Sequence, residues 1–84
     1  MYRVETDEQA KPQVDALPAH ALSSYAELRT LLEVAPWSGD LINKENPEAQ
    51  VRNLTFGPHH EGMITYLILE HQRRVDVLYV TWLD

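Results

Sequence analysis

The sequence lacks cysteine, has few positive charges and contains no long apolar run. None of its 84 residues is cysteine, which excludes disulfides, thiolate metal sites and cysteine nucleophiles. We therefore expect a reducing, cytoplasmic location. No apolar segment approaches the ~20 residues that cross a membrane, so no membrane partner is expected. A hydrophobic content of 44% is sufficient for folding, and the length predicts a single domain over residues 1–84.

The charge is unbalanced toward the acids. Seven lysines and arginines stand against 13 aspartates and glutamates, and the net charge of −6 is unfavourable for binding a phosphate backbone. Residues 1–42 carry a net charge of −4, whereas residues 43–84 carry −2 and three of the four histidines. Because histidine usually gains a proton just below neutral pH, the second half can become positive there. The charge therefore opposes constitutive RNA binding and is compatible with RNA binding at lower pH.

Residue spacing predicts an α+β domain. The predicted elements are a strand, a short helix, a longer helix and three strands, at residues 2–6, 8–17, 19–34, 51–56, 63–69 and 75–83. The short helix either spans residues 8–17 or begins near Pro12, because proline fits only the first turn. The longer helix is predicted by a 4-3-4-3 spacing of apolar residues on one helical face, namely Ala21, Tyr25, Leu28, Leu32 and Ala35. Short polar turns join the last three strands, which predicts an antiparallel meander. The first strand and the meander are expected to form one antiparallel sheet packed against both helices.

Several motifs follow one another along essentially the whole chain. They are Tyr2-Arg3-Val4, Leu17-Pro18, residues 31–39, Val51-Arg52-Asn53-Leu54, Gly62-Met63-Ile64-Thr65-Tyr66 and residues 74–80. With the element order, they resemble the RelE/ParE superfamily of bacterial toxin–antitoxin systems, and this chain resembles a divergent RelE-like member. The resemblance implies the same fold and an antitoxin protein as partner. The RelE-type members that this chain resembles are basic proteins. They enter the ribosomal A site and cut mRNA with the transcript's own 2′-hydroxyl as nucleophile.

Two positions depart from the RelE pattern. The family usually has an arginine two or three residues before the tyrosine of this motif, where the present sequence has Met63 and Ile64. The family also carries basic or aromatic residues after the last strand, where the present sequence has Trp82-Leu83-Asp84. The resemblance therefore implies weak or conditional RNA cleavage rather than an efficient ribosome-dependent toxin.

One group of side chains has the chemistry that metal-independent RNA cleavage needs. Such cleavage requires a base, an acid and a cation that stabilises the phosphorane charge. We predict that His59 or His60 is the acid or base, with Glu61 as its partner, and that Arg52 binds the phosphate. Tyr66 can join them if its ring faces the same side. On the alternative interpretation, which the polar composition of turns favours, this segment is only a hairpin turn.

Three further cations are candidate RNA contacts. Lys44 lies in the loop after the longer helix, and Arg73 and Arg74 lie in the turn before the last strand. The alternatives are a solvated loop and a charged hairpin tip that prevents association through the sheet edge. No metal or other cofactor is expected, because nothing completes a ligand set around His59 and His60.

The position of each aromatic residue on its predicted helix or strand indicates whether its side chain is buried. Tyr25, Tyr79 and Trp82 are expected in the core, and Trp37 is left between core packing and base stacking.

Two functions of different classes remain open. The first is a weak or pH-dependent, metal-independent endoribonuclease of RelE type. The second is a non-enzymatic interaction module, either a degenerate toxin bound by an antitoxin or a ParE-like protein directed at gyrase. The apolar stripe and the strands also allow a homodimer.

Overall fold

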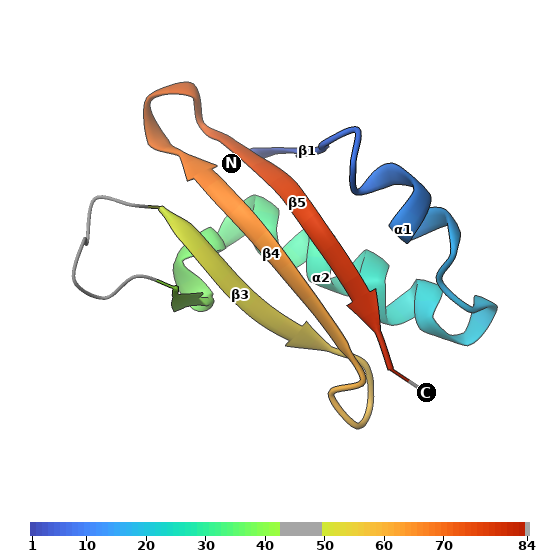
Figure 1. Cartoon of the computed structure of the whole chain (residues 1–84). Coiled ribbons are helices and arrows are strands. Elements are labelled where there is room, and N and C mark those ends of the chain that lie inside the picture. The colour runs from blue at the N-terminus through green and yellow to red at the C-terminus, as the bar shows by residue number, and fades with distance from the viewer. Residues whose placement is uncertain (43–49, 84) are drawn as a thin grey trace.

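The computed structural model describes residues 1–42 and 50–83 of the chain. Its elements, the larger of which are labelled in Figure 1, are β1 (Arg3–Thr6), α1 (Lys11–Asp15), η1 (Ala19–Ala21), α2 (Leu22–Val34), η2 (Pro36–Ser38), β2 (Asp40–Leu41), β3 (Val51–Phe56), β4 (Gly62–Leu69), η3 (Glu70–Gln72) and β5 (Arg74–Trp82). The α+β class and the β3–β4–β5 meander agree with the sequence prediction.

The five strands form one mixed sheet in the order β1-β5-β4-β3-β2. The prediction of a wholly antiparallel sheet is wrong, because β1 pairs parallel with β5, from Arg3 opposite Arg74 to Thr6 opposite Val77. No tight turn joins these two strands, so the long connection between them permits the parallel direction. The two-residue strand β2 was not predicted, since it is too short to show an alternating pattern.

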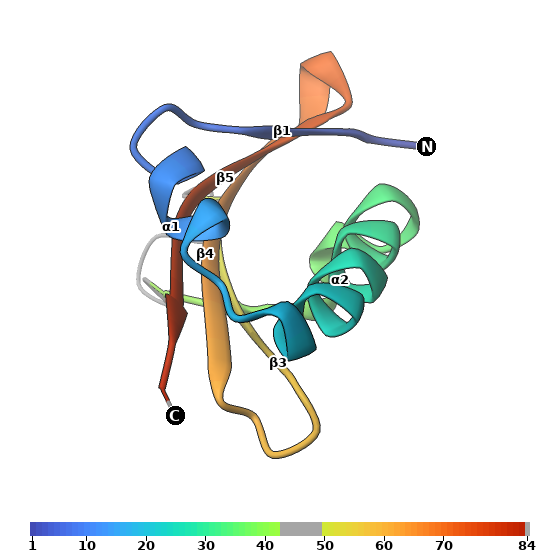
Figure 2. The same cartoon turned by 90° about the vertical axis from the view of Figure 1, so that its right-hand side faces the viewer.

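Only one of the two predicted helices is long. α1 has five residues with Pro12 in its first turn, and none of its side chains is buried. α2 runs along one face of the sheet (Figure 2) and buries Tyr25, Leu28 and Leu32, as the helical spacing predicted. The expectation that two helices cover this face is therefore corrected: α2 covers it, and the segment around α1 lies along β5. We call the face under α2 the inner face and the opposite one the outer face.

A β-bulge determines which side chains of β5 reach each face. Thr65 pairs with Tyr79 and Tyr66 pairs with Val77, so Leu78 is an extra residue in β5. The bulge shifts the alternation by one position. Val77 and Val80 are therefore both buried, whereas Tyr79 turns to the outer face and is 49% exposed. The prediction that Tyr79 belongs to the core is wrong for this reason.

The core lies between α2 and the inner face. Its largest fully buried side chains include Leu32, Ile64, Tyr66 and Ile68. Trp82 is partly buried and packs against this core, as predicted. Among the described residues, no helix is long and apolar enough to cross a membrane.

Candidate functional site

The outer face of the meander is a part of the sheet that α2 leaves uncovered (Figure 2). The side chains that point to it are, by strand register, Val51, Asn53 and Thr55 on β3, Met63, Thr65, Leu67 and Leu69 on β4, and Arg74, Asp76, Tyr79 and Thr81 on β5. These are mostly neutral side chains, and Thr65 Oγ1 donates to Asn53 Oδ1 at 2.8 Å. The one cation among them, Arg74, is paired with Asp76 at the end of the sheet away from the β3–β4 turn. A face of this kind supplies hydrogen-bond partners and apolar contacts, but little positive charge for a phosphate.

The turn between β3 and β4 brings one predicted catalytic residue to this face. His60 has a left-handed backbone, with φ of 60°, and its Nδ1 lies 2.8 Å from Thr55 Oγ1 on the outer face. Glu61 Oε1 accepts the backbone N–H of His59 at 2.8 Å. Gly57, with φ of 99°, begins the turn, and its carbonyl accepts His60 N–H at 3.2 Å. The turn thus presents the imidazole of His60 on the outer face, and the Glu61 carboxylate holds the turn through the backbone of His59.

Arg52 lies at the opposite end of β3 from this turn. Its Nη1 donates to the carbonyl oxygens of Gly39, at 2.7 Å, and Trp37, at 3.2 Å. Its guanidinium also stacks over the Trp37 ring, 5.1 Å from the centroid. The predicted phosphate clamp is therefore corrected: this guanidinium binds the segment that leads into β2, and it does not converge with His60.

Tyr66 also lies away from the turn, because it points to the inner face opposite Arg52. The ring is fully buried, and its hydroxyl donates to Pro36 O at 2.6 Å and accepts Gly39 N–H at 3.1 Å. Burial raises the pKa of Tyr66 above its usual value, and the Gly39 N–H and the Arg52 charge oppose that rise only in part. A buried, neutral phenol whose hydroxyl makes two hydrogen bonds within the chain cannot touch RNA. The predicted catalytic role of Tyr66 is therefore corrected to a structural one.

The predicted RNA-binding cations lie away from the His60 turn or outside the described residues. Arg73 lies 4.0 Å from the Glu70 carboxylate, and its guanidinium stacks over the Tyr2 ring, 5.5 Å from the centroid. Arg74 Nε is 2.8 Å from Asp76 and 3.4 Å from Glu5, and the Asp76 hydrogen bond raises the pKa of Arg74. Both arginines follow the end of β4, whereas the His60 turn precedes its start. Lys44 lies outside the described residues.

The remaining two arginines are engaged as well. Arg29 donates to Val4 O at 3.0 Å and to Thr6 Oγ1 at 3.1 Å, which ties α2 to β1. Arg3 lies 3.4 Å from the Glu5 carboxylate. Each of the five arginines in the chain therefore contacts another group of the same chain.

Sequence reasoning missed one candidate and left another unassigned. Tyr79 offers an exposed phenol on the outer face, and only the bulge reveals it. Trp37 is 43% exposed, and its Nε1 donates to Tyr2 Oη at 3.3 Å, so it is partly packed and partly available. Among the described residues, no three histidine, aspartate or glutamate side chains gather as a metal site would require.

Comparison by sequence finds no relative. No family model matches the chain, and no curated protein matches it.

Comparison by structure gives a clear result. The isolated RelE toxin of E. coli superposes with a TM-score of 0.81 at 14% identity, over 100% of this chain and 86% of that chain. The toxin–antitoxin complex RelBE2 of Mycobacterium tuberculosis gives 0.76 at 19% identity, over 96% of each chain. The archaeal RelE–RelB complex of Pyrococcus horikoshii gives 0.65 at 17% identity, over 96% of this chain and 93% of that one. The chain therefore has the RelE fold, which confirms at the level of fold the resemblance that its motifs carry.

Proposed function

We propose that this chain is the toxin-fold member of a toxin–antitoxin pair and that binding an antitoxin protein is its main function. The observation that carries the proposal is that Arg29, Arg52 and Arg74 are half-buried and bonded within the chain, on a protein of net charge −6. Phosphate binding depends on available cations, so this surface favours a protein partner over RNA. The fold agrees with that partner, since the M. tuberculosis and P. horikoshii structures are complexes with antitoxins. A cytoplasmic location remains the prediction for the pair.

The test is co-expression of this chain with the product of a small reading frame beside its gene. We expect the two proteins to copurify without a tag on the antitoxin, and calorimetry of the separate proteins to show a stoichiometric complex. If they elute separately and calorimetry detects no binding, the proposal is wrong.

A second candidate function is weak RNA cleavage that is favoured at acidic pH. The hydrogen-bond contact between His60 and Thr55 supports it, because a held imidazole on an open face is suited to acid–base work. Tyr79 also presents a phenol on the outer face. It lies on β5, two residues before Thr81, and Thr81 pairs with Met63 near the start of β4. No arginine reaches the imidazole by any described contact, so the phosphorane charge is poorly stabilised and the rate is low.

Incubation of tag-free protein with total RNA between pH 5 and 8 tests this activity. We expect cleavage to increase toward pH 6, where histidine protonation weakens the repulsion of RNA. His60→Ala should abolish cleavage, and His59→Ala is the matched control that should retain it. A flat pH profile, or equal activity of both variants, would show that His60 does not carry the reaction.

A further inference from the structure

β3 has an open edge beyond the end of β2. β2 pairs only with Arg52 and Asn53, and the chain before it turns away through η2. Ile68 N–H bonds Gln50 O, so the even-numbered residues of β3 direct their backbone groups to β4. Thr55 therefore directs its N–H and C=O away from β4, into the position that β2 no longer occupies. Within the described residues, no backbone group lies opposite it in the sheet.

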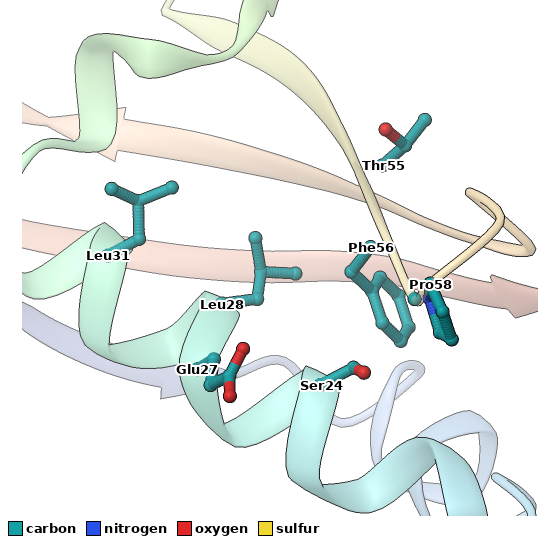
Figure 3. Close-up of a pocket in the computed structure, with 8 residues that line it drawn as sticks. Ser24, Glu27, Leu28, Leu31, Thr55, Phe56 and Pro58 are labelled. Atoms are coloured by element: carbon teal, nitrogen blue, oxygen red, sulfur yellow. The ribbon is translucent and has the colours of Figure 1, made fainter.

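A groove with apolar walls and polar residues, Glu27 and Ser24, in its lining lies beside this edge on the inner face. It has a volume of about 470 Å³ and runs between α2 and the end of β3 (Figure 3). Phe56 points from β3 into it, and Leu28 and Leu31 point toward it from α2, whereas Thr55 points to the other side of the strand. Leu31 is 37% exposed, which is unusual for a leucine that faces a sheet. The groove has room for side chains of an added strand.

A second hollow lies on the outer side of the same edge. It has a volume of about 280 Å³ and is lined by Asp40, Asn53, Leu54, Thr55 and Met63. The inner groove includes Glu27 in its lining. Each hollow thus carries one carboxylate, and neither is lined by a lysine or arginine of the described residues.

We propose that an extended segment of a protein partner adds to the sheet at this edge, antiparallel to β3 and hydrogen-bonded to the backbone of Thr55. Residues directly opposite in an antiparallel pair share a face. The partner residue opposite Thr55 therefore enters the outer hollow, where Asp40 favours lysine or arginine. The partner residue opposite Phe56 enters the inner groove, where Leu28 and Leu31 favour an apolar side chain. Gly39 precedes Asp40 in an extended conformation and takes the place opposite Leu54, so the segment begins opposite Thr55 with the pattern basic–apolar. This inference rests on the proposed function and names the surface and chemistry of its partner.

Charge distinguishes this partner from a second copy of the chain. A symmetric contact would bring Asp40 and Glu27 of each copy to the same edge, between two chains that each carry −6. A basic segment removes that repulsion and also benefits from long-range attraction. The open edge thus fits a basic, extended partner segment better than it fits itself.

The probe is a synthetic peptide of alternating valine and lysine, about nine residues long, and the control peptide replaces lysine by glutamate. Thr55→Pro removes the edge N–H, and Thr55→Ala is its matched control, because both lose the hydroxyl contact with His60. Leu31→Asn removes an apolar wall of the groove, and Leu22→Asn is its control on the same helix, exposed but outside the groove. Affinity is measured by calorimetry, and the Thr55 amide is followed by hydrogen exchange.

We expect the lysine peptide alone to bind and to protect the Thr55 amide. Thr55→Pro and Leu31→Asn should each weaken binding about tenfold, and the two controls by less than about twofold. Equal binding of both peptides, or no loss in either edge variant, would overturn the proposal. A dimer of the free protein that Thr55→Pro and Leu31→Asn dissociate would overturn it in favour of a second copy.

The same variants separate this inference from the proposed function. If the antitoxin binds all of them with unchanged affinity, the edge is not its site and the inference is wrong, while the toxin–antitoxin function stands. If no antitoxin binds but the lysine peptide behaves as expected, the proposed function is wrong and the edge site stands.

Discussion

The two outer strands of the meander, β5 and β3, are each paired along only part of their outer edge, but their unpaired parts differ. Beyond β1, side chains from the segment around α1 cover the edge of β5: Gln9 Nε2 donates to Leu78 O at 3.2 Å, and Gln13 Oε1 accepts Val80 N–H at 2.7 Å. Beyond β2, no described segment does the same for Thr55. The same sheet therefore has one edge sealed by glutamines and one edge left open.

The difference follows from the path of the chain. The chain from β1 to α2 must pass along β5, so polar side chains are available there to satisfy its backbone. The chain before β2 is instead held in η2 by the Tyr66 hydroxyl, which bonds both Pro36 and Gly39. Exposed strand edges invite association, and proteins usually cover them. An edge that is open beside a groove with apolar walls is therefore a feature to be explained by a partner.

The largest effect is expected when the anchor of η2 is broken at Gly39. A Cβ at this position would meet the Tyr66 hydroxyl oxygen, and it would lie 2.7 Å from the carbonyl oxygen of Asn53. Gly39→Ala should therefore lower the free energy of unfolding by about 3 kcal/mol and detach β2, which lengthens the open edge. Urea unfolding measures the loss, and Ser38→Ala is the control, with a change within about 0.5 kcal/mol. Equal stability of Gly39→Ala and the unmodified chain would contradict the role of this anchor.

A smaller loss is expected for Tyr66→Phe, which keeps the ring and removes the hydroxyl. Pro36 O and Gly39 N–H lose their partner, which costs about 2 kcal/mol. Urea unfolding at neutral pH measures this loss. A loss below about 0.5 kcal/mol would show that the hydroxyl does not anchor η2.

The same hydroxyl predicts a pH dependence. Burial raises the pKa of Tyr66 in the folded state. The stabilisation of the fold by the neutral hydroxyl is therefore complete below the ordinary tyrosine pKa of about 10, and it is lost as pH rises through the pKa of the folded state. Stability should thus fall above about pH 10, and less steeply in Tyr66→Phe. Parallel alkaline profiles of the two proteins would contradict this assignment.

The sealed edge should open in Gln13→Ala. The Val80 N–H would lose its acceptor, which lowers the free energy of unfolding by about 1 kcal/mol and speeds hydrogen exchange of the Val80 amide. Gln9→Ala is a milder comparison, because its bond to Leu78 O is exposed. If the Val80 amide exchanges no faster in Gln13→Ala than in the unmodified chain, the Gln13 side chain does not seal the β5 edge.

The smallest effect on stability is expected at the open edge itself. Thr55→Pro removes an N–H that bonds no described backbone group, and proline is tolerated at strand edges. Its free energy of unfolding should match that of Thr55→Ala within about 0.5 kcal/mol. A loss several times larger would show that the Thr55 amide has a partner within the chain.

The parts of the fold that follow local periodicity could be predicted from the sequence. The spacing of Tyr25, Leu28 and Leu32 identified the buried face of α2, and alternation with short turns identified the meander. The parallel β1–β5 pair and the short strand β2 could not be predicted, because both depend on contacts between distant segments. For the first helix the sequence left two alternatives, residues 8–17 or a start near Pro12, and α1 agrees with the second.

The candidate site was predicted less well than the fold. Position in the sequence suggested that Arg52, Tyr66 and the His60 turn were close, but Arg52 lies near the start of β3 and the turn follows the end of that strand. The alternation of Ile64, Tyr66 and Ile68 already placed Tyr66 on the buried face, and this signal was available. The approach of His60 to Thr55 was not, because it depends on a left-handed backbone that the sequence does not specify for histidine.

The bulge at Leu78 has a consequence for how this chain is compared with others. It acts as a one-residue insertion, so positions before and after it have opposite parity along β5. A relative without the extra residue must be aligned with a gap at this point. Otherwise each outward side chain, Tyr79 and Thr81 included, is matched with an inward one. Identities in this strand are therefore informative only when its two halves are aligned separately.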